Sequence, residues 1–241
     1  MPLFWLDPSE PPAFPPLNKA DIGGLLAVGG DITPDWLTAA YRHGAFPWFE
    51  HDEEFYWYSP DPRCVLFPEE LRVHKSMRSI FNQHKFRYTL DTCFEEVMLA
   101  CANRAREGHP GTWITPRFVK GYTEMYRLGI GHSVEVWQDE ALVGGLYGLA
   151  FGRIFCGESM FARTTNASKA GFIVLVRALQ KQGFTLIDCQ QETEHLLSLG
   201  ARSIPRTEFA AYLNQNQYQR TLVGRWRFDA DLNLEVLEIQ P

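Results

Sequence analysis

A strand–helix–strand pattern in the second half of the chain constrains the fold most. Residues 155–161 and 186–190 are short runs of apolar, aromatic and β-branched side chains, as in buried strands. Residues 166–182, which separate them, have the periodicity of a helix. A helix of this length between two strands is typical of a crossover that joins parallel neighbours in one sheet.

Polar side chains interrupt both strands. Glu158 lies in the first, and Asp188 and Gln190 lie in the second. Alternation along a strand predicts Asp188 and Gln190 on one face and Ile187 and Cys189 on the other. A buried carboxylate is costly unless it is paired or has a function. Both acids can be structural partners of Arg or of backbone donors. Asp188 and Gln190 lie at the carboxyl end of their strand, where open sheets bind ligands, so two acids and an amide there favour a site.

The rest of the pattern predicts a mixed α+β chain. Antiparallel strands are expected at 133–137, 142–150 and 153–161, and Asp91, Thr193 and Thr207 are expected to cap helices. An antiparallel meander, a crossover helix and a parallel strand follow one another in N-acyltransferase folds. The rigid turn at 59–62 predicts a small N-terminal domain, 1–63, and a second domain, 64–241. Further helices are expected at 34–43, 75–83, 91–104, 115–129, 193–200 and 207–214.

Composition excludes several classes of protein. The five cysteines are scattered and form no C-x-x-C pair, which argues against a disulfide framework or a zinc site and for a reducing cytoplasm. The histidines show no metal-ligand spacing, so no metal is expected. No apolar run approaches the roughly 20 residues of a membrane helix, so no membrane partner is expected.

The charges are unevenly distributed along the chain. Residues 1–62 contain 10 acidic and 2 basic side chains, although the whole chain has a net charge of only −6. A later stretch has five cations and no acidic residue, and such a cluster can bind a phosphate backbone. The alternative is an ordinary solvated helix face. The five are Arg72, Lys75, Arg78, Lys85 and Arg87.

A series of short motifs, in order over about residues 23–213, carries a family resemblance. The chain resembles the bacterial leucyl/phenylalanyl-tRNA–protein transferases. No single motif is diagnostic, but their joint occurrence is. The motifs are Gly29–Asp31, Phe46–Phe49, Trp57–Arg63, Thr112–Thr115, His132–Trp137, Leu142–Gly145, Phe155–Phe161, Asn166–Lys169, Ile187–Gln190, Ser198–Ala201 and Ile204–Arg206.

The resemblance implies an aminoacyltransferase that needs neither metal nor coenzyme. Leucine or phenylalanine, and also methionine, would move from aminoacyl-tRNA to the α-amine of proteins that begin with Arg or Lys. The new N-terminus would mark those proteins for degradation. The resemblance also implies a small N-terminal domain followed by an N-acyltransferase-like (GCN5-related) domain with a mixed central sheet. A cytoplasmic monomer is expected.

The catalytic candidates also come from the resemblance. Asp188 would accept the proton of the amine, so that replacement by Ala would remove transfer and retain the fold. Gln190 would orient that amine or stabilise the oxyanion. In the alternative route a ribose hydroxyl carries the proton and these residues only position the substrates. Glu158 would shape the site or attract the acceptor.

By their position in the family's motifs, several apolar and aromatic side chains are expected to bind the aminoacyl-tRNA. Trp48 and Trp113 are expected to stack on the 3′-adenosine, the alternative being a hydrophobic lid. The aminoacyl pocket is expected to accept unbranched Cβ groups, and each of its wall residues has an alternative role in the core. The expected walls are Leu146, Phe155, Met160, Phe172, Leu175 and Ile187.

Two other functions compete with this interpretation. An acyl-coenzyme A enzyme would need a glycine-rich loop before the crossover helix, and the loop 163–169 has no glycine. A non-enzymatic RNA-binding module would explain the basic stretch, but not a carboxylate and an amide together at a strand end.

Overall fold

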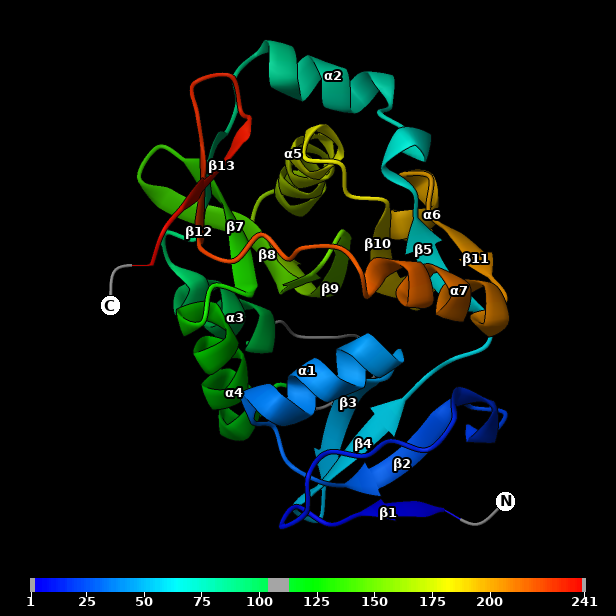
Figure 1. Cartoon of the computed structure of the whole chain (residues 1–241). Helices are drawn as coiled ribbons and strands as arrows, with labels where there is room; N and C mark the ends of the chain where they lie inside the picture. The colour runs from blue at the N-terminus through cyan, green and yellow to red at the C-terminus, as the bar shows by residue number, and fades with distance from the viewer. Residues whose placement is uncertain (1–2, 104–112, 240–241) are drawn as a thin grey trace.

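The computed structural model describes residues 3–103 and 113–239. Two predicted positions lie outside the described residues: Arg104, where a helix was expected to end, and Thr112, the first residue of the motif Thr112–Thr115. Figure 1 shows a small sheet at the N-terminal end of the molecule and a larger sheet beyond helix α1.

The N-terminal part forms a four-stranded sheet with the order β1-β2-β4-β3. Pro34 opens the helix α1, and Gly44 ends it with a left-handed φ of 102°, as the sequence predicts. Trp36 and Leu37 of this helix are buried. The elements are β1 (Phe4–Leu6), η1 (Leu17–Lys19), β2 (Leu25–Gly29), α1 (Pro34–His43), β3 (Phe46–His51) and β4 (Glu54–Tyr58).

The rest of the chain is built on a mixed seven-stranded sheet with the order β11-β5-β10-β9-β8-β7-β6. Its strands are β5 (Arg63–Leu66), β6 (Arg87–Leu90), β7 (Gly131–Gln138), β8 (Ala141–Phe151), β9 (Ile154–Ala162), β10 (Leu186–Gln190) and β11 (Arg202–Ile204). Its helices are η2 (Pro68–Glu70), α2 (Lys75–Asn82), α3 (Phe94–Ala102), α4 (Pro116–Arg127), α5 (Ala167–Lys181), α6 (Glu194–Ser198) and α7 (Arg206–Asn216).

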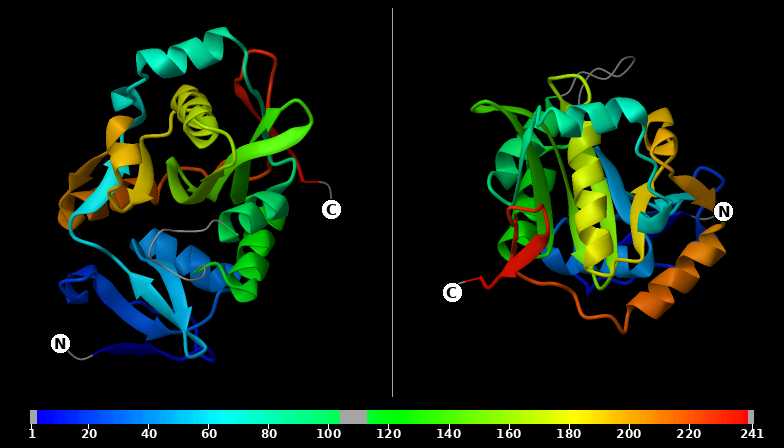
Figure 2. Two further views of the ribbon diagram at one scale, coloured as in Figure 1. Left: turned by 180° about the vertical axis from the view of Figure 1, so that it is seen from behind. Right: turned by 90° about the horizontal axis from the view of Figure 1, so that it is seen from above.

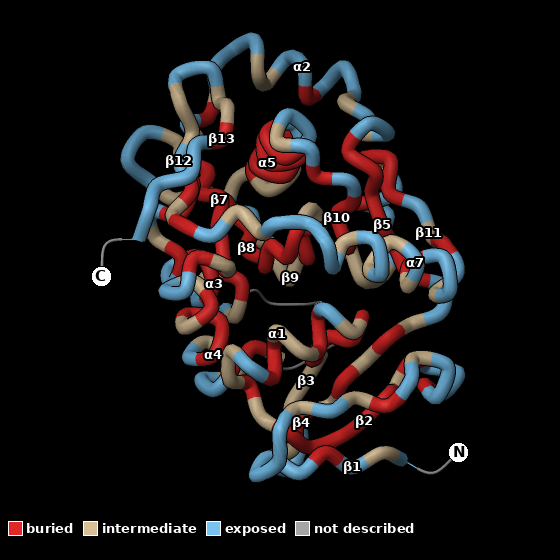
Figure 3. Tube along the Cα trace, in the orientation of Figure 1, coloured by how far each residue is buried: buried red, intermediate tan, exposed pale blue. Residues whose placement is uncertain are grey.

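The predicted crossover is confirmed. Strands β6, β7, β8 and β9 pair antiparallel, and β9 pairs with β10 parallel after the helix α5. The α+β class with an N-acyltransferase-like mixed sheet is therefore confirmed. The helix α5 is buried along most of its length over one face of the sheet (Figure 2, Figure 3).

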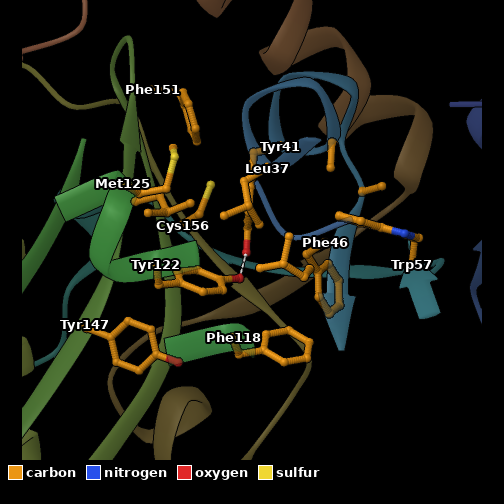
Figure 4. Packing of buried hydrophobic residues seen from close by; sticks show 14 of the residues in the cluster. Leu37, Tyr41, Phe46, Trp57, Phe118, Tyr122, Met125, Tyr147, Phe151 and Cys156 are labelled. Carbon is orange, nitrogen blue, oxygen red and sulfur yellow. Dashed lines mark hydrogen bonds between the residues drawn. The ribbon is translucent and has the colours of Figure 1, made fainter. Parts of the chain in front are cut away.

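The two faces of the large sheet pack into separate cores. Residues such as Val134 and Ile187 pack with α5 in one hydrophobic cluster. On the other face, Tyr147 and Cys156 pack with α1, α3 and α4 and with Trp57 of the small sheet (Figure 4). Since this second cluster contains residues from both sides of position 63, the two predicted domains share a core. The boundary at 63 stays a prediction.

Two predicted caps are wrong. The carboxylate of Asp91 does not cap α3; it binds the ring of His132 and the backbone N–H of Ser133 instead. That buried pairing satisfies the charge better than a helix end would. The helix α7 begins at Arg206, one residue before the expected cap Thr207, because Pro205 already precedes its first turn. Thr193 does cap α6, accepting from the N–H of Leu196.

The C-terminal residues form the hairpin β12 (Arg225–Phe228) and β13 (Leu234–Leu237). The ring of Trp226 stacks on His132 with a centroid distance of 3.5 Å, and its backbone N–H donates to Asp91. The weakly strand-like tail of the sequence is therefore attached to the rest of the fold through a buried ring and through hydrogen bonds such as that from the backbone N–H of Gly224 to Gly129.

Candidate aminoacyl-transfer site

The site forms where β9 and β10 separate. The two strands pair up to Cys156 and Asp188, and β9 then continues to Ala162 without a partner in β10. Each strand also bulges at this point: Glu158 is the extra residue of β9 against β8, and Cys189 that of β10 against β5. Bulges redirect side chains and are common beside active sites.

The predicted facing of side chains is confirmed. Ile187 and Cys189 pack on the α5 side of the sheet, whereas Asp188 and Gln190 point to the other side, where Arg63 and Glu158 lie. All four residues nevertheless line one cavity, because it opens at the end of β10. Gln190 has a left-handed φ of 63°, which turns its side chain toward Glu158. The backbone strain of such a residue marks a position that the surrounding contacts enforce.

The cavity has a volume of about 650 Å³. Trp48, a bulged residue of β3, and Trp113 line it from the N-terminal side and from the segment before α4. A cavity of this size suits an amino acid joined to a nucleoside, since pockets for drug-sized ligands have about 300–1,000 Å³. The predicted stacking role of the two rings stays a prediction.

Asp188 is held by a buried arginine. Its carboxylate accepts from Nε and Nη2 of Arg63 at 2.8 and 2.6 Å, and both side chains are 1% exposed. Burial alone would lower the pKa of Arg63, but the neighbouring Asp188 carboxylate outweighs it and raises that pKa. The guanidinium also lies between the rings of Phe46 and Phe209, 4.6 Å from each centroid. Asp188 is therefore anchored as part of a buried ion pair.

Asp188 in turn holds the amide residue of the site. Its Oδ1 accepts the backbone N–H of Gln190 at 3.0 Å, across the bulge. The side-chain amide of Gln190 donates to Oε1 of Glu158 at 3.1 Å. The three polar residues that the sequence singled out are thus brought together, with Gln190 in the middle.

Two tyrosines support Glu158 from below the sheet. Tyr122 of α4 donates to Oε2 of Glu158 at 3.0 Å, and its hydroxyl is 2.5 Å from that of Tyr41 of α1 (Figure 4). Burial raises the pKa of the Glu158 carboxyl to about 7, and hydrogen bonds from the tyrosines and Gln190 oppose this only in part. Glu158 thus changes charge near neutral pH.

The raised pKa of Glu158 predicts a measurable pH effect on stability. The folded protein keeps this proton to about pH 7 and an unfolded chain to about 4.5, so the folded state binds more protons between these values. Stability should therefore fall as pH rises through this window, by about 1–3 kcal/mol. Urea unfolding at several pH values should show that Glu158→Gln removes this loss.

The matched control for this titration is Glu96→Gln, on the exposed side of α3. It should retain the pH dependence of the wild-type protein, because its carboxylate is solvated. Equal pH dependence of the Glu158→Gln variant and the wild type would contradict the assigned titration.

The predicted pocket walls divide into two groups. Leu146, Met160, Phe172 and Ile187 line the cavity. Phe155 does not, because its ring packs in the core on the α5 side of the sheet, 6.4 Å from the ring of Trp226.

Leu175 also lies outside the lining of the cavity. It is one helical turn beyond Phe172 on α5 and packs in the core between α5 and the sheet. Together with Phe155 it is therefore removed from the proposed walls.

Sequence reasoning missed several polar groups of the cavity. Tyr147, Ser159, Ser168 and His195 all line it. Ser159 follows the bulged Glu158, so strict alternation could not place it. His195 lies on the short helix α6, whose start the Thr193 cap predicts, but its place at the cavity depends on the fold.

The basic stretch lies outside the cavity but begins beside it. The backbone N–H of Arg72 donates to Leu199, and the His74 ring lies 2.7 Å from the carbonyl of Ser198, so α6 connects this stretch to the cavity wall. From there α2 runs over α5 (Figure 1). Lys75, Arg78 and Arg87 are exposed like Arg72, and Lys85 is half-buried.

The fold adds one cation to this surface. Arg177 of α5 is exposed and lies 5.6 Å from the ring of Phe81 at the end of α2. Its distance along the chain hid it from sequence analysis. Within residues 3–103 and 113–239 there is no group of three potential metal ligands, and no helix there is long and apolar enough to cross a membrane.

The antiparallel meander, the crossover helix and the parallel strand, with a cavity where the two parallel strands separate, define an N-acyltransferase-like fold. Two family models then identify the family. The leucyl/phenylalanyl-tRNA protein transferase model matches residues 65–214, and the model of that family's N-terminal domain matches residues 30–61. The chain belongs to this family of aminoacyltransferases.

Curated relatives agree with the family models. The leucyl/phenylalanyl-tRNA–protein transferase of Azotobacter vinelandii is 56% identical over 203 residues, covering 83% of this chain and 89% of that protein. The enzyme of the same name from Pseudomonas aeruginosa (strain LESB58) is 55% identical over 208 residues, covering 86% and 92%.

Solved structures give distant similarities only. L-PGS from Bacillus licheniformis matches with a TM-score of 0.38 and 11% identity, over 68% of this chain and 51% of that one. A GCN5-related N-acetyltransferase from Kribbella flavida matches with a TM-score of 0.37 and 14% identity, over 70% and 60%.

Proposed function

We propose that this protein transfers leucine, phenylalanine or methionine from aminoacyl-tRNA to the α-amine of proteins that begin with Arg or Lys, and thereby marks them for degradation. The observation that carries the proposal is the cavity at the β9–β10 splay. It combines apolar walls with the hydrogen-bonded residues Asp188, Gln190 and Glu158. Family membership supplies the class of donor.

The reaction is the aminolysis of an ester. The amine nitrogen attacks the ester carbonyl, the new amide bond forms, and the bond to the ribose oxygen breaks. One proton leaves the amine and one is taken up by the departing ribose oxygen, which becomes a hydroxyl, so a relay between the amine and this oxygen balances the reaction. Positioning of the two substrates supplies much of the rate in such a step.

We assign positioning roles to the polar residues. The Asp188 carboxylate is already occupied by Arg63 and by the backbone of Gln190, which favours the route in which the ribose hydroxyl carries the proton. The Gln190 amide is the group placed to hold the amine or the oxyanion. Glu158 orients that amide and, when ionised, adds negative charge for a cationic acceptor.

Peptide transfer tests the proposed function directly. Radiolabelled Leu, Phe, Met or Ile on tRNA is offered with a peptide that begins with Arg, or with one that begins with Ala. Transfer of the first three to the Arg peptide, with Ile about 10–200-fold slower, is expected because a second branch on Cβ collides with the cavity wall. Equal transfer from Ile-tRNA, or to the Ala peptide, would overturn the assignment.

The basic stretch should bind the tRNA backbone. In the double variant Lys75→Ala/Arg78→Ala, affinity for all charged tRNAs should fall alike, and the salt dependence should flatten by about one unit of slope per lost contact. The preference for Leu and Phe should stay unchanged, since it belongs to the cavity. Filter binding over a range of salt concentrations measures both quantities.

The control for this double variant is Lys120→Ala/Arg127→Ala, with two exposed cations removed from α4. It changes the net charge equally and should leave the salt slope as it is. An equal slope change in both double variants would mean that the net charge, and not the α2 surface, attracts the tRNA.

We further propose a cytoplasmic monomer, as the sequence suggested.

A further inference from the structure

A row of aromatic rings leads away from the cavity along the small sheet. Trp48 lines the cavity, and its ring packs edge-on against Tyr58 with centroids 5.0 Å apart. The Tyr58 ring is 5.7 Å from Phe49, which stacks on Tyr56 at 4.7 Å and 20°. We call these four residues, Trp48, Phe49, Tyr56 and Tyr58, the aromatic row.

The alternation of β4 leaves this row accessible. Phe55 and Trp57 point into the core and are fully buried, so Tyr56 and Tyr58 point to the opposite face and are half-buried. Tyr56 pairs with Phe49 across the strands, which places both rings on that face. Adjacent, partly exposed rings of this kind are typical of interaction sites.

The surroundings of the aromatic row are acidic. Asp52 and Glu53 form the turn between β3 and β4, and Glu54 follows. Asp21 lies near Tyr58: burial raises the pKa of the Tyr58 hydroxyl most, and the charge of Asp21 raises it further. Such a surface repels a phosphate backbone and attracts a cationic polypeptide.

The arginine nearest to this turn is neutralised on the inner side of the sheet. Arg117 of α4 pairs with Glu50 at 2.9 Å and with Asp31 at 3.5 Å, and its guanidinium lies over the buried ring of Phe55. It also donates to the backbone carbonyl of Glu53 in the turn, but two carboxylates already match its charge, so the surface stays acidic.

We propose that the aromatic row and the acidic turn bind the acceptor polypeptide beyond its first residues; the proposal rests on the proposed function. The partner is an extended, flexible segment with basic and apolar side chains. The row adjoins the cavity at Trp48, and strands and extended peptides both rise about 3.3 Å per residue. The turn at the far end of β3 should therefore contact about the third to sixth residue of the acceptor.

Two independent variants test this surface. Phe49→Ser/Tyr56→Ser removes two rings without touching Trp48, and Asp52→Asn/Glu54→Gln removes two charges. Asp52 has a left-handed φ of 51°, which Asn tolerates. The acceptors are Arg-Ala amide and a peptide of about ten residues that begins with Arg and has Lys and Leu at positions three to six.

Matched controls remove the same groups elsewhere. Tyr218→Ser removes a ring that is 84% exposed, far along the sequence on the segment after α7. Asp139→Asn/Glu140→Gln removes two charges from the β7–β8 turn, where Asp139 has a similar left-handed φ of 53°.

Each test variant should raise the KM for the long acceptor by about fivefold or more, because truncated anchor residues of an interface typically cost this much. The KM for Arg-Ala amide, the KM for Leu-tRNA and all constants of the control variants should stay at wild-type values. An unchanged KM for the long acceptor in both test variants would overturn the proposal. An equal change for both acceptors, or a raised KM for tRNA, would overturn it as well.

A failure of the proposed function is distinguishable from a failure of this surface. If the wild-type protein transferred leucine to neither acceptor, the proposed function would be wrong. Fluorescence anisotropy with the labelled long peptide would still decide the surface: weaker binding to both test variants than to the controls supports it, and equal binding overturns it.

Discussion

Asp188→Ala is expected to lower the free energy of unfolding by about 3–5 kcal/mol, because it leaves the guanidinium of Arg63 buried without a counter-charge. Arg63 and Asp188 are each 1% exposed and share two hydrogen bonds. The sequence alone suggested that this variant would retain the fold and lose only transfer. Urea denaturation of the purified variant measures the expected loss.

A double variant separates burial from charge. Arg63→Met/Asp188→Leu removes both charges and fills the space with apolar groups, so it should be more stable than Asp188→Ala. A double-mutant cycle with the single variants gives the coupling between the two side chains. If Asp188→Ala were as stable as the wild type, Asp188 would have no structural role. Its role as the base that accepts the amine proton would then be favoured over a positioning role.

Gln190→Ala is expected to lower the single-turnover rate of transfer by about 10²–10³, the usual effect of removing one oriented donor at a developing oxyanion. Its amide lies between Glu158 and the cavity, and its backbone N–H is held by Asp188. Stability should change by less than about 1 kcal/mol, because the side chain is half-buried and no buried charge is left unpaired.

Gln191→Ala is the control for this substitution. Gln191 is the next residue, lines the same cavity and is also half-buried. Its loss should leave the transfer rate within about threefold of wild type, since the effect expected of Gln190 belongs to its oriented amide. A Gln190→Ala variant that transferred leucine as fast as Gln191→Ala would remove Gln190 from the reaction.

Local patterns were sufficient for the architecture. The parallel pair β9–β10 and the helix α5 were predicted because hydrophobic periodicity and strand length are properties of neighbouring residues. The same holds for Gly44 and Thr193, whose side chains or conformations act within one helical turn. The family was also recognisable, since its motifs are short and keep their order along the chain.

The site itself depended on the tertiary structure. Trp48, Glu158 and Cys189 are bulged residues, and a bulge exists only relative to the register of a partner strand. Alternation within one strand placed Cys189 correctly with Ile187, but it could not show that Gln190 would meet Glu158 of another strand. Phe155 and Leu175 were misplaced because an apolar core residue and an apolar cavity wall have the same local pattern, and only the packing between α5 and the sheet separates them.

Long-range pairing decided the electrostatics. The sequence identified Asp188 as costly to bury and left open whether an arginine paired with it; the partner is Arg63, 125 residues away. The hydroxyls of Tyr41 and Tyr122 reach Glu158 from two helices on the other side of the sheet. Such contacts form only when strands and helices from distant segments pack together, and the low polarity created by that packing is what raises the pKa of Glu158.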